Sequence, residues 1–206
     1  IHKDVYDAVI NKLLTRASKL RLGPGLSEGT DVGPVINEKQ CASILEHIRK
    51  AKSEGAVCVL GGDRIVENDL GKGNFIAPTI FVDVLPTMSL FKEEVFGPVL
   101  AISRADSFEH ALELANDCEY GLSSSLYTAN VSRAFMAIRD IEAGITYINA
   151  PTIGAEAHMP FGGIKGTGNG HREGGWTVFD IFTEWKSVYV DYSGALQRAQ
   201  IDNYED

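Results

Sequence analysis

Segments of strand-like composition alternate along this chain with amphipathic segments, and this alternation limits the fold more than any other feature. The strand-like segments lie at 57–60, 99–103, 123–127 and 145–148. In the amphipathic segments the apolar residues recur every three or four positions, as on one face of a helix, at 5–20, 41–51, 108–115 and 131–141. Strands separated by helices are usually parallel. The sequence therefore predicts an α/β fold with a mostly parallel sheet and helices on both faces.

Local signals set expected boundaries and turns. Asn37 with Gln40, and Asp106 with Glu109, have the spacing of a capping box at the start of a helix. Residues 160–175 contain seven glycines. Because glycine adopts backbone conformations closed to other residues, we expect this backbone to turn tightly or to approach another group closely.

Composition excludes several classes of partner. The 206 residues carry 19 Lys and Arg against 28 Asp and Glu, a formal net charge of −9, and nucleic acid or anionic lipid would favour a basic patch instead. No apolar run approaches the roughly 20 residues of a membrane helix, and the start does not resemble a signal peptide. The widely spaced Cys41, Cys58 and Cys118 predict neither a disulfide framework nor a metal site. We expect a cytoplasmic protein without nucleic-acid, membrane or metal partners.

The sequence Glu-Glu-Val-Phe-Gly-Pro at 93–98 places two carboxylates and a ring before a Gly-Pro break that leads into an apolar strand. Loops held by rigid elements often carry binding groups. A glutamate two residues before a phenylalanine suits a ligand with hydroxyls beside a flat heterocycle, because the carboxylate accepts from the hydroxyls and the ring covers the plane. A surface turn with solvated glutamates and a core phenylalanine is the alternative at this point.

A second motif, Pro-Phe-Gly-Gly-Ile-Lys-Gly-Thr-Gly, occupies 160–168. In sequence and order the two motifs resemble those of the NAD(P)-dependent aldehyde dehydrogenase superfamily. Gly33-Pro34 before a helix, Asn149, and the run at 184–186 fit the same family. The resemblance covers essentially the whole chain, but only the C-terminal part of the family's catalytic domain and its oligomerisation strand.

The resemblance implies a reaction for the full-length enzyme. In this family a cysteine thiolate attacks the aldehyde, the thiohemiacetal passes hydride to the nicotinamide, and a glutamate-activated water hydrolyses the thioester to the acid. The nucleophile lies in a Gly-Gln-x-Cys segment, which the 206 residues do not contain. We therefore assign no catalytic residue here, expect the cysteine and the base upstream of Ile1, and expect the isolated chain to be inactive. Its own three cysteines are interpreted as small apolar residues.

Three residues match binding positions of the family. Glu94 matches the glutamate that accepts hydrogen bonds from the nicotinamide ribose, and Phe96 matches the aromatic beside the nicotinamide ring. Phe161 matches an aromatic that lines the aldehyde tunnel, with a buried core ring as its alternative. Gln40 lies where some relatives contact the adenosine ribose, but its capping-box position explains it equally well. The implied cofactor is NAD or NADP, and the substrate is a small-molecule aldehyde.

The segment 150–159 occupies the position of the family's variable substrate loop. Glu156 and His158 in it are candidates for contact with a polar substrate tail or for simple solvation. The composition of this loop is similar to that of branches that oxidise semialdehydes, such as aminoadipate semialdehyde. Residues 171–173 are interpreted as structural.

The expected organisation is a catalytic part at 1–184 followed by an oligomerisation strand and tail at 185–206. Residues 187–192 alternate like a half-exposed strand, which predicts pairing with another subunit in a homodimer or homotetramer. One alternative is a non-catalytic module that kept the fold for oligomerisation. Another is a related acyl-phosphate-type reductase, against which Glu94 and Phe96 favour the hydrolytic enzymes.

Overall fold

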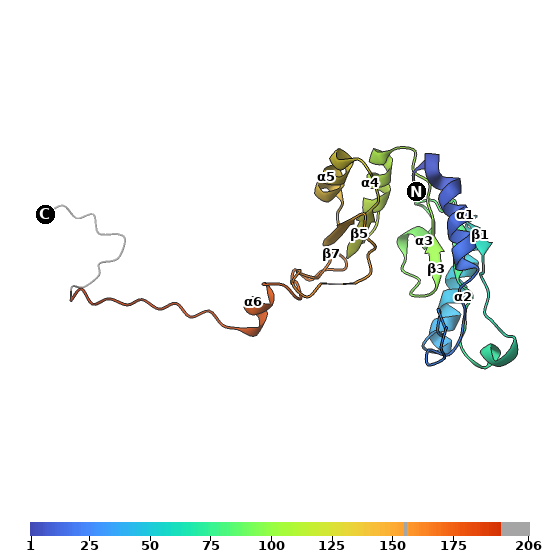
Figure 1. Cartoon of the computed structure of the whole chain (residues 1–206), viewed down its shortest axis with the longest axis horizontal. Coiled ribbons are helices and arrows are strands. Elements are labelled where there is room, and N and C mark those ends of the chain that lie inside the picture. The colour runs from blue at the N-terminus through green and yellow to red at the C-terminus, as the bar shows by residue number, and fades with distance from the viewer. Residues whose placement is uncertain (155, 195–206) are drawn as a thin grey trace.

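The computed structural model of the chain describes residues 1–154 and 156–194 (Figure 1). Its first part is a three-stranded sheet in the order β1-β2-β3, with β1 and β2 antiparallel and β2 and β3 parallel. The elements of this part are the 3-10 turn Lys3–Val5, α1 (Tyr6–Ala17), α2 (Glu38–Ser53), β1 (Val57–Leu60), the 3-10 turn Asn68–Lys72, β2 (Thr79–Val82), α3 (Ser89–Lys92) and β3 (Val99–Ala101).

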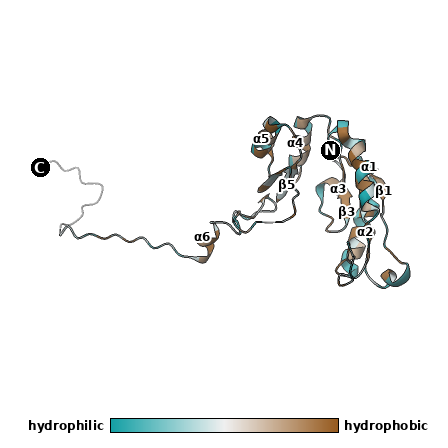
Figure 2. Ribbon diagram, in the orientation of Figure 1, coloured by the Kyte–Doolittle hydropathy of each residue, from teal (hydrophilic) through white to brown (hydrophobic). Residues whose placement is uncertain are grey.

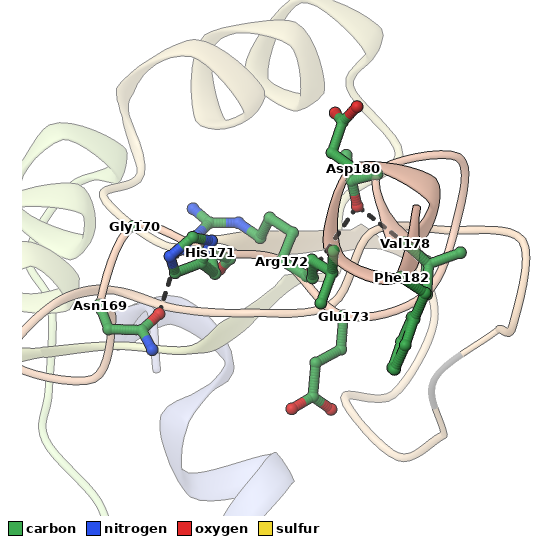
Figure 3. A pocket seen from close by; sticks show the side chains of 11 residues that line it. Asn169, Gly170, His171, Arg172, Glu173, Val178, Asp180 and Phe182 are labelled. Carbon is green, nitrogen blue, oxygen red and sulfur yellow. Dashed lines mark hydrogen bonds between the residues drawn. The ribbon is translucent and has the colours of Figure 1, made fainter. Parts of the chain in front are cut away.

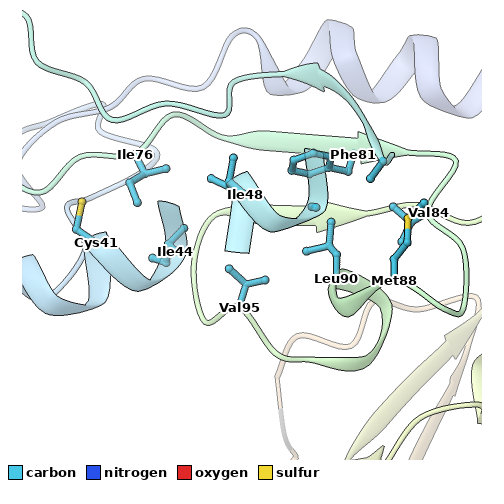
Figure 4. Packing of buried hydrophobic residues seen from close by; sticks show 11 residues of the cluster. Cys41, Ile44, Ile48, Ile76, Phe81, Val84, Met88, Leu90 and Val95 are labelled. Atoms are coloured by element: carbon cyan, nitrogen blue, oxygen red, sulfur yellow. The ribbon is translucent and has the colours of Figure 1, made fainter. Parts of the chain in front are cut away.

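The central strand β2 is buried on both faces, and its side chains alternate between two helices. Ile80 and Val82 pack with Tyr6 and with the apolar residues of α1. Phe81 points the other way, into the cluster formed by α2 and the segment 76–95. Figure 4 shows this second cluster, with Val95 packed beside Ile44 and Ile48 of α2. Successive residues of a strand face opposite sides, so this one strand anchors helices on both faces of the sheet.

The predicted apolar stripe is confirmed for α2, whereas the packed face of α1 is shifted from the expected one. Val5, Val9 and Leu20 are exposed. Tyr6, Ile10, Leu13 and Leu14 pack against β2 instead. In Figure 2 brown and teal residues occur on the same turns of α1 and α2, because each helix has one apolar and one polar side. The buried residues of α2 are Cys41, Ile44, Ile48 and Ala51, at the spacing of a single helix face. The Oδ1 atom of Asn37 accepts a hydrogen bond from the N–H of Gln40 at 2.9 Å, which confirms the predicted N-cap.

The second part of the chain contains two small sheets beside a pair of helices. β5 and β6 are parallel, and β4 and β7 are antiparallel. Its elements are α4 (Phe108–Asn116), β4 (Tyr120–Gly121), β5 (Ser123–Leu126), α5 (Val131–Asp140), β6 (Ile145–Ile148), β7 (Ile164–Lys165) and α6 (Val178–Phe182). Asn116 links the ends of both helices, donating to the Asp140 carbonyl at 2.8 Å and accepting from the Glu142 N–H at 2.8 Å.

The glycine-rich segment at 160–175 lies very close to the backbone before β6 and to another part of its own backbone. A Cβ atom on Gly144 would lie 1.9 Å from the carbonyl oxygen of Gly162, and one on Gly168 would lie 2.1 Å from that of Gly163. No side chain fits at such separations, since real Cβ contacts are essentially never below 3.0 Å. The predicted close approach is therefore an approach of the chain to itself.

Several boundaries differ from those expected. The described residues form three small sheets rather than one mostly parallel sheet. In the first sheet β1 and β2 are antiparallel, because the connection between them contains no crossover helix of the kind that parallel strands require. Ser107, not Asp106, caps α4, and it accepts from the N–H of His110 at 3.1 Å.

The expected C-terminal strand at 187–192 has no strand partner in the described part of the chain. Figure 1 shows this segment leading away from the rest of the described chain. Its backbone N–H and C=O groups therefore have no partner strand among the described residues. A β-strand is stabilised by hydrogen bonds between these groups and a neighbouring strand. The rest of the expected tail, 195–206, lies outside the described residues.

Candidate functional site

The loop at 93–98 joins α3 to β3 and lies along one side of α2. Val95 is buried in the cluster around α2. Gly97 comes so close to α2 that an added Cβ would lie 2.5 Å from Ile44 Cδ1. The carbonyl of Pro98 accepts from the N–H of Thr79 at 2.8 Å, which fixes the entry into the sheet. The loop is thus held by a helix on one side and a strand on the other.

The two glutamates of this loop have different surroundings. Glu93 accepts a hydrogen bond from Lys50 Nζ at 3.0 Å, and its other oxygen lies 3.8 Å from His47 Nδ1. The hydrogen bond to Glu93 raises the pKa of Lys50 above its ordinary value. Glu94 is exposed and has no hydrogen bond or ion pair with any described residue. Glu93 therefore connects the loop to α2, whereas both carboxylate oxygens of Glu94 are without a hydrogen-bond partner among the described residues.

Phe96 has an unusual backbone conformation for its residue type. Its φ is +54°, in the left-handed region that favours glycine, and its side chain is 77 % exposed. A bulky residue in this region is strained, and such strain persists only where the surroundings fix the chain. The core alternative for Phe96 is wrong, because the ring is presented to solvent beside the free carboxylate of Glu94.

The side chain of Gln40 contacts the same loop. Its Nε2 donates to the carbonyl oxygen of Val95 at 3.3 Å and to that of Phe96 at 3.2 Å. Only the N–H of Gln40 takes part in the helix cap. The sequence placed Gln40 in a capping box but gave no sign of its second partner, which lies 55 and 56 residues further along the chain.

Phe161 lies in the second part of the chain, between β6 and β7. Its backbone pairs with Glu173 in both directions, with the Phe161 N–H donating at 2.5 Å and the Glu173 N–H donating at 2.7 Å. Its side chain is 36 % exposed, so it is not a fully buried core ring. The ring lines a cavity of about 430 Å³ together with Tyr147, Glu156 and His158. The structure thus brings Phe161 together with Glu156 and His158 of the segment 150–159.

The start of that segment is fixed by Asn149. Its side chain accepts from the N–H of Thr128 at 2.8 Å and donates to the Thr128 carbonyl at 3.0 Å. Tyr147 donates its hydroxyl to the Gly154 carbonyl at 2.7 Å. These bonds hold the segment over the ends of β5 and β6, where it forms one wall of the cavity.

A larger hollow of about 860 Å³ lies between the turn at 169–174 and α6 (Figure 3). Asn169 Oδ1 accepts from the N–H of His171 at 3.0 Å, and the Thr177 hydroxyl bonds the carbonyls of Arg172 and Gly174 at 3.3 and 3.0 Å. These bonds shape the turn whose residue Glu173 pairs with Phe161. They agree with a structural role for residues 171–173.

The three cysteines lie in the core or after a helix end. Cys41 is fully buried in the α2 cluster, and Cys58 packs against the same cluster. The Cys118 thiol donates to the Tyr120 carbonyl at 3.1 Å, after the end of α4. All three are free thiols. Within residues 1–154 and 156–194, no group of His, Cys, Asp or Glu is arranged to hold a metal ion, and no helix is long and apolar enough to cross a membrane.

The structure places the predicted residues in two groups. Glu94 and Phe96 lie on one loop beside α2, and Phe161 lies in the second part of the chain (Figure 1). Sequence reasoning missed that one face of α2 holds this loop, through Gln40, Ile44, His47 and Lys50. They follow one another at helical spacing, which identifies a shared face but not the loop that this face contacts.

Comparisons with known proteins match most of the chain to one family. The model of the aldehyde dehydrogenase family matches residues 1–188. The α-ketoglutaric semialdehyde dehydrogenase of Bacillus subtilis is 37% identical over 190 residues, which cover 92% of this chain and 39% of that protein. The α-ketoglutarate semialdehyde dehydrogenase of Haloferax volcanii is 40% identical over 193 residues, which cover 93% of this chain and 40% of that protein.

A solved structure has the same fold. The betaine aldehyde dehydrogenase of Staphylococcus aureus in complex with NAD⁺ superposes with a TM-score of 0.84 at 31% identity, covering 88% of this chain and 36% of that one. This likeness confirms the fold expected from the two motifs. The chain spans about two fifths of the length of the relatives it matches.

Proposed function

Because the chain belongs to the aldehyde dehydrogenase family, we propose that it is the C-terminal part of the catalytic domain of an enzyme that oxidises an aldehyde to a carboxylic acid with NAD or NADP. The observation that carries this proposal is the loop at 93–98. Its Glu94 carboxylate has no partner in the described chain, its Phe96 ring is exposed, and its backbone is held by α2. We divide the chain into this catalytic part, 1–184, and an oligomerisation strand with its tail, 185–206.

Glu94 and Phe96 bind the nicotinamide half of the cofactor in this proposal. The Glu94 carboxylate accepts hydrogen bonds from the ribose hydroxyls, because it is a pure acceptor with both oxygens available. The Phe96 ring lies against the nicotinamide and fixes its plane. The bound cofactor supplies the hydride acceptor of the oxidation. The betaine aldehyde dehydrogenase that was solved in complex with NAD⁺ supports the use of a nicotinamide cofactor.

Phe161 lines the path of the aldehyde, and the cavity beside it is the substrate pocket in this proposal. The ring gives the pocket an apolar wall, while Glu156 and His158 give it a polar one. A polar wall favours an aldehyde whose other end carries a polar or charged group. The two semialdehyde dehydrogenases among the relatives support a semialdehyde.

The test is oxidation by the native-length protein that contains this chain. We expect cofactor-dependent oxidation of semialdehydes, followed by the absorbance of the reduced nicotinamide, and acid as the product. We expect none from the isolated 206 residues, because they lack a Gly-Gln-x-Cys nucleophile. Turnover by the isolated chain would refute its predicted inactivity.

The alternative is a non-catalytic module that keeps the fold for oligomerisation. It predicts that the native-length protein lacks a Gly-Gln-x-Cys segment and binds neither dinucleotide. Determining the intact mass and N-terminal sequence of the native protein separates the two. A longer chain with that segment supports the enzyme, and a native chain that begins at Ile1 supports the module.

A further inference from the structure

Gln40 makes two hydrogen bonds that capping of α2 does not require. In a capping box, the side chain of the fourth residue reaches back to the N–H of the N-cap residue. Here only half of that arrangement forms, because Asn37 bonds the Gln40 N–H while the Gln40 carboxamide turns away to the loop. This side chain thus contributes to the site rather than to the helix end.

The two carbonyls that Gln40 holds belong to the two peptide planes on either side of Phe96. The Val95 carbonyl lies in the plane before Phe96, and the Phe96 carbonyl lies in the plane after it. Fixing both planes fixes the two backbone dihedral angles between them, and this is the residue whose φ of +54° needs external support. Within the described residues, Gln40 is the one hydrogen-bond partner of these two carbonyls.

The other anchors of the loop act on different atoms. Lys50 holds the side chain of Glu93, Val95 is buried by its own side chain, and Gly97 lies against Ile44. These contacts set how close the loop lies to α2. None of them fixes the backbone dihedral angles of Phe96. These angles decide where its ring points relative to Glu94, two residues earlier in the loop.

We infer that Gln40 is a positioning residue for cofactor binding: its carboxamide holds both peptide planes that flank Phe96 and thereby orients Phe96 and Glu94 toward the nicotinamide riboside. The inference rests on the proposed function, since it takes Glu94 and Phe96 as cofactor ligands. It assigns to Gln40 an action through the loop and not a contact with the cofactor.

The first test is Gln40→Met in the native-length protein. Methionine has similar length and no donor, and the helix cap keeps its backbone bond. Because the loss of both bonds frees the backbone at Phe96, we expect the Kd for NAD⁺ or NADP⁺ to rise roughly tenfold. The KM for the aldehyde stays unchanged. Lys39→Met, at the exposed neighbouring position of the same helix turn, is the matched control and leaves both constants unchanged.

The second test is a double-mutant cycle with Glu94→Gln. If Gln40 acts through the loop, Gln40→Met weakens cofactor binding much less in the Glu94→Gln background than in the wild type. The combined loss of cofactor affinity in the double variant is then smaller than the product of the two single losses. Losses that multiply would mean an independent contact with the cofactor and would overturn the inference.

The failures of the two proposals are distinguishable. A native-length protein that binds NAD⁺ or NADP⁺ equally well with Gln40→Met would overturn this inference alone. A wild-type protein that binds neither dinucleotide would overturn the proposed function, and this inference with it.

Discussion

The two neighbouring glutamates of the loop at 93–98 differ in their contacts with α2. Glu93 bonds Lys50 and lies near His47, and Glu94 has no hydrogen bond or ion pair with any described residue. We expect Glu94→Gln to raise the cofactor KM about tenfold or more, because hydrogen bonds to a charged group contribute roughly 1.5–3 kcal/mol. Glu93→Gln is the matched control, and steady-state kinetics with varied cofactor compare the two. A larger effect from Glu93→Gln would reverse the assignment.

Phe96 combines a strained backbone with an exposed ring, and two substitutions separate these properties. Phe96→Ala removes the ring and keeps the unfavourable φ, whereas Phe96→Gly removes the ring and relieves the strain. We expect the glycine variant to be more stable than the alanine variant by about 1 kcal/mol. Both should lose cofactor affinity. Urea unfolding measures the first difference, and equal stabilities would show that the loop is not strained at Phe96.

At the scale of elements, the packing of the loop against α2 requires a residue without a side chain at position 97. A Cβ on Gly97 would lie 2.5 Å from Cδ1 and 2.7 Å from Cγ1 of Ile44, which is fully buried. Overpacking of this kind costs about 1–3 kcal/mol, so Gly97→Ala should destabilise the protein by that amount. Denaturant unfolding measures the loss.

A second substitution tests the cause of that loss. Ile44→Val removes Cδ1, the nearest of the clashing atoms. In the Gly97→Ala background it should therefore restore part of the stability, although alone it leaves a small cavity and destabilises by about 0.5–1.5 kcal/mol. Strictly additive effects of the two substitutions would mean that the contact between them is not responsible.

The end of α2 is joined to α3 by a pH-dependent contact. Glu54 accepts hydrogen bonds from the N–H and the hydroxyl of Ser89, both at 2.8 Å, and chiefly the N–H lowers the pKa of its carboxyl below the ordinary 4.5. Because the folded pKa is depressed, the stabilisation is present above the unfolded pKa and is lost as the pH falls through the folded pKa. Glu54→Gln should destabilise the protein at neutral pH, and this loss of stability should shrink as the pH falls below 4.5 and through the lower folded pKa. Unfolding measured over a series of pH values from neutral to acid tests this, and a loss that stays constant over the series would contradict it.

Sequence reasoning was most successful where the information is local. The apolar spacing of α2 and the Asn37 cap were read from consecutive residues, and both are present. The pairing of β1 with β2 was not predicted, since strand direction depends on the path of the loop between them. The partner of the Gln40 carboxamide could not be found for the same reason: it lies 55 residues away and is joined only by the fold.

At the scale of the whole molecule, several large apolar side chains of the described residues are exposed to solvent. They include Phe135 of α5, Phe182 of α6, and Trp185 beyond it. Exposed apolar patches of this kind mark surfaces that other protein covers. A larger enzyme, as proposed above, supplies such cover.

The segment 187–192 is the most exposed of these surfaces, with Tyr189 91% and Tyr192 95% exposed. We propose that it adds a strand to the sheet of another subunit, because its unpaired backbone and alternating side chains suit edge pairing. A native-length protein shortened to end at Glu184 should then sediment as a smaller species than the intact homodimer or homotetramer. A protein shortened to end at Gly194 keeps the segment and should retain the intact size. Retention of the intact size by the protein that ends at Glu184 would place the oligomer contact elsewhere.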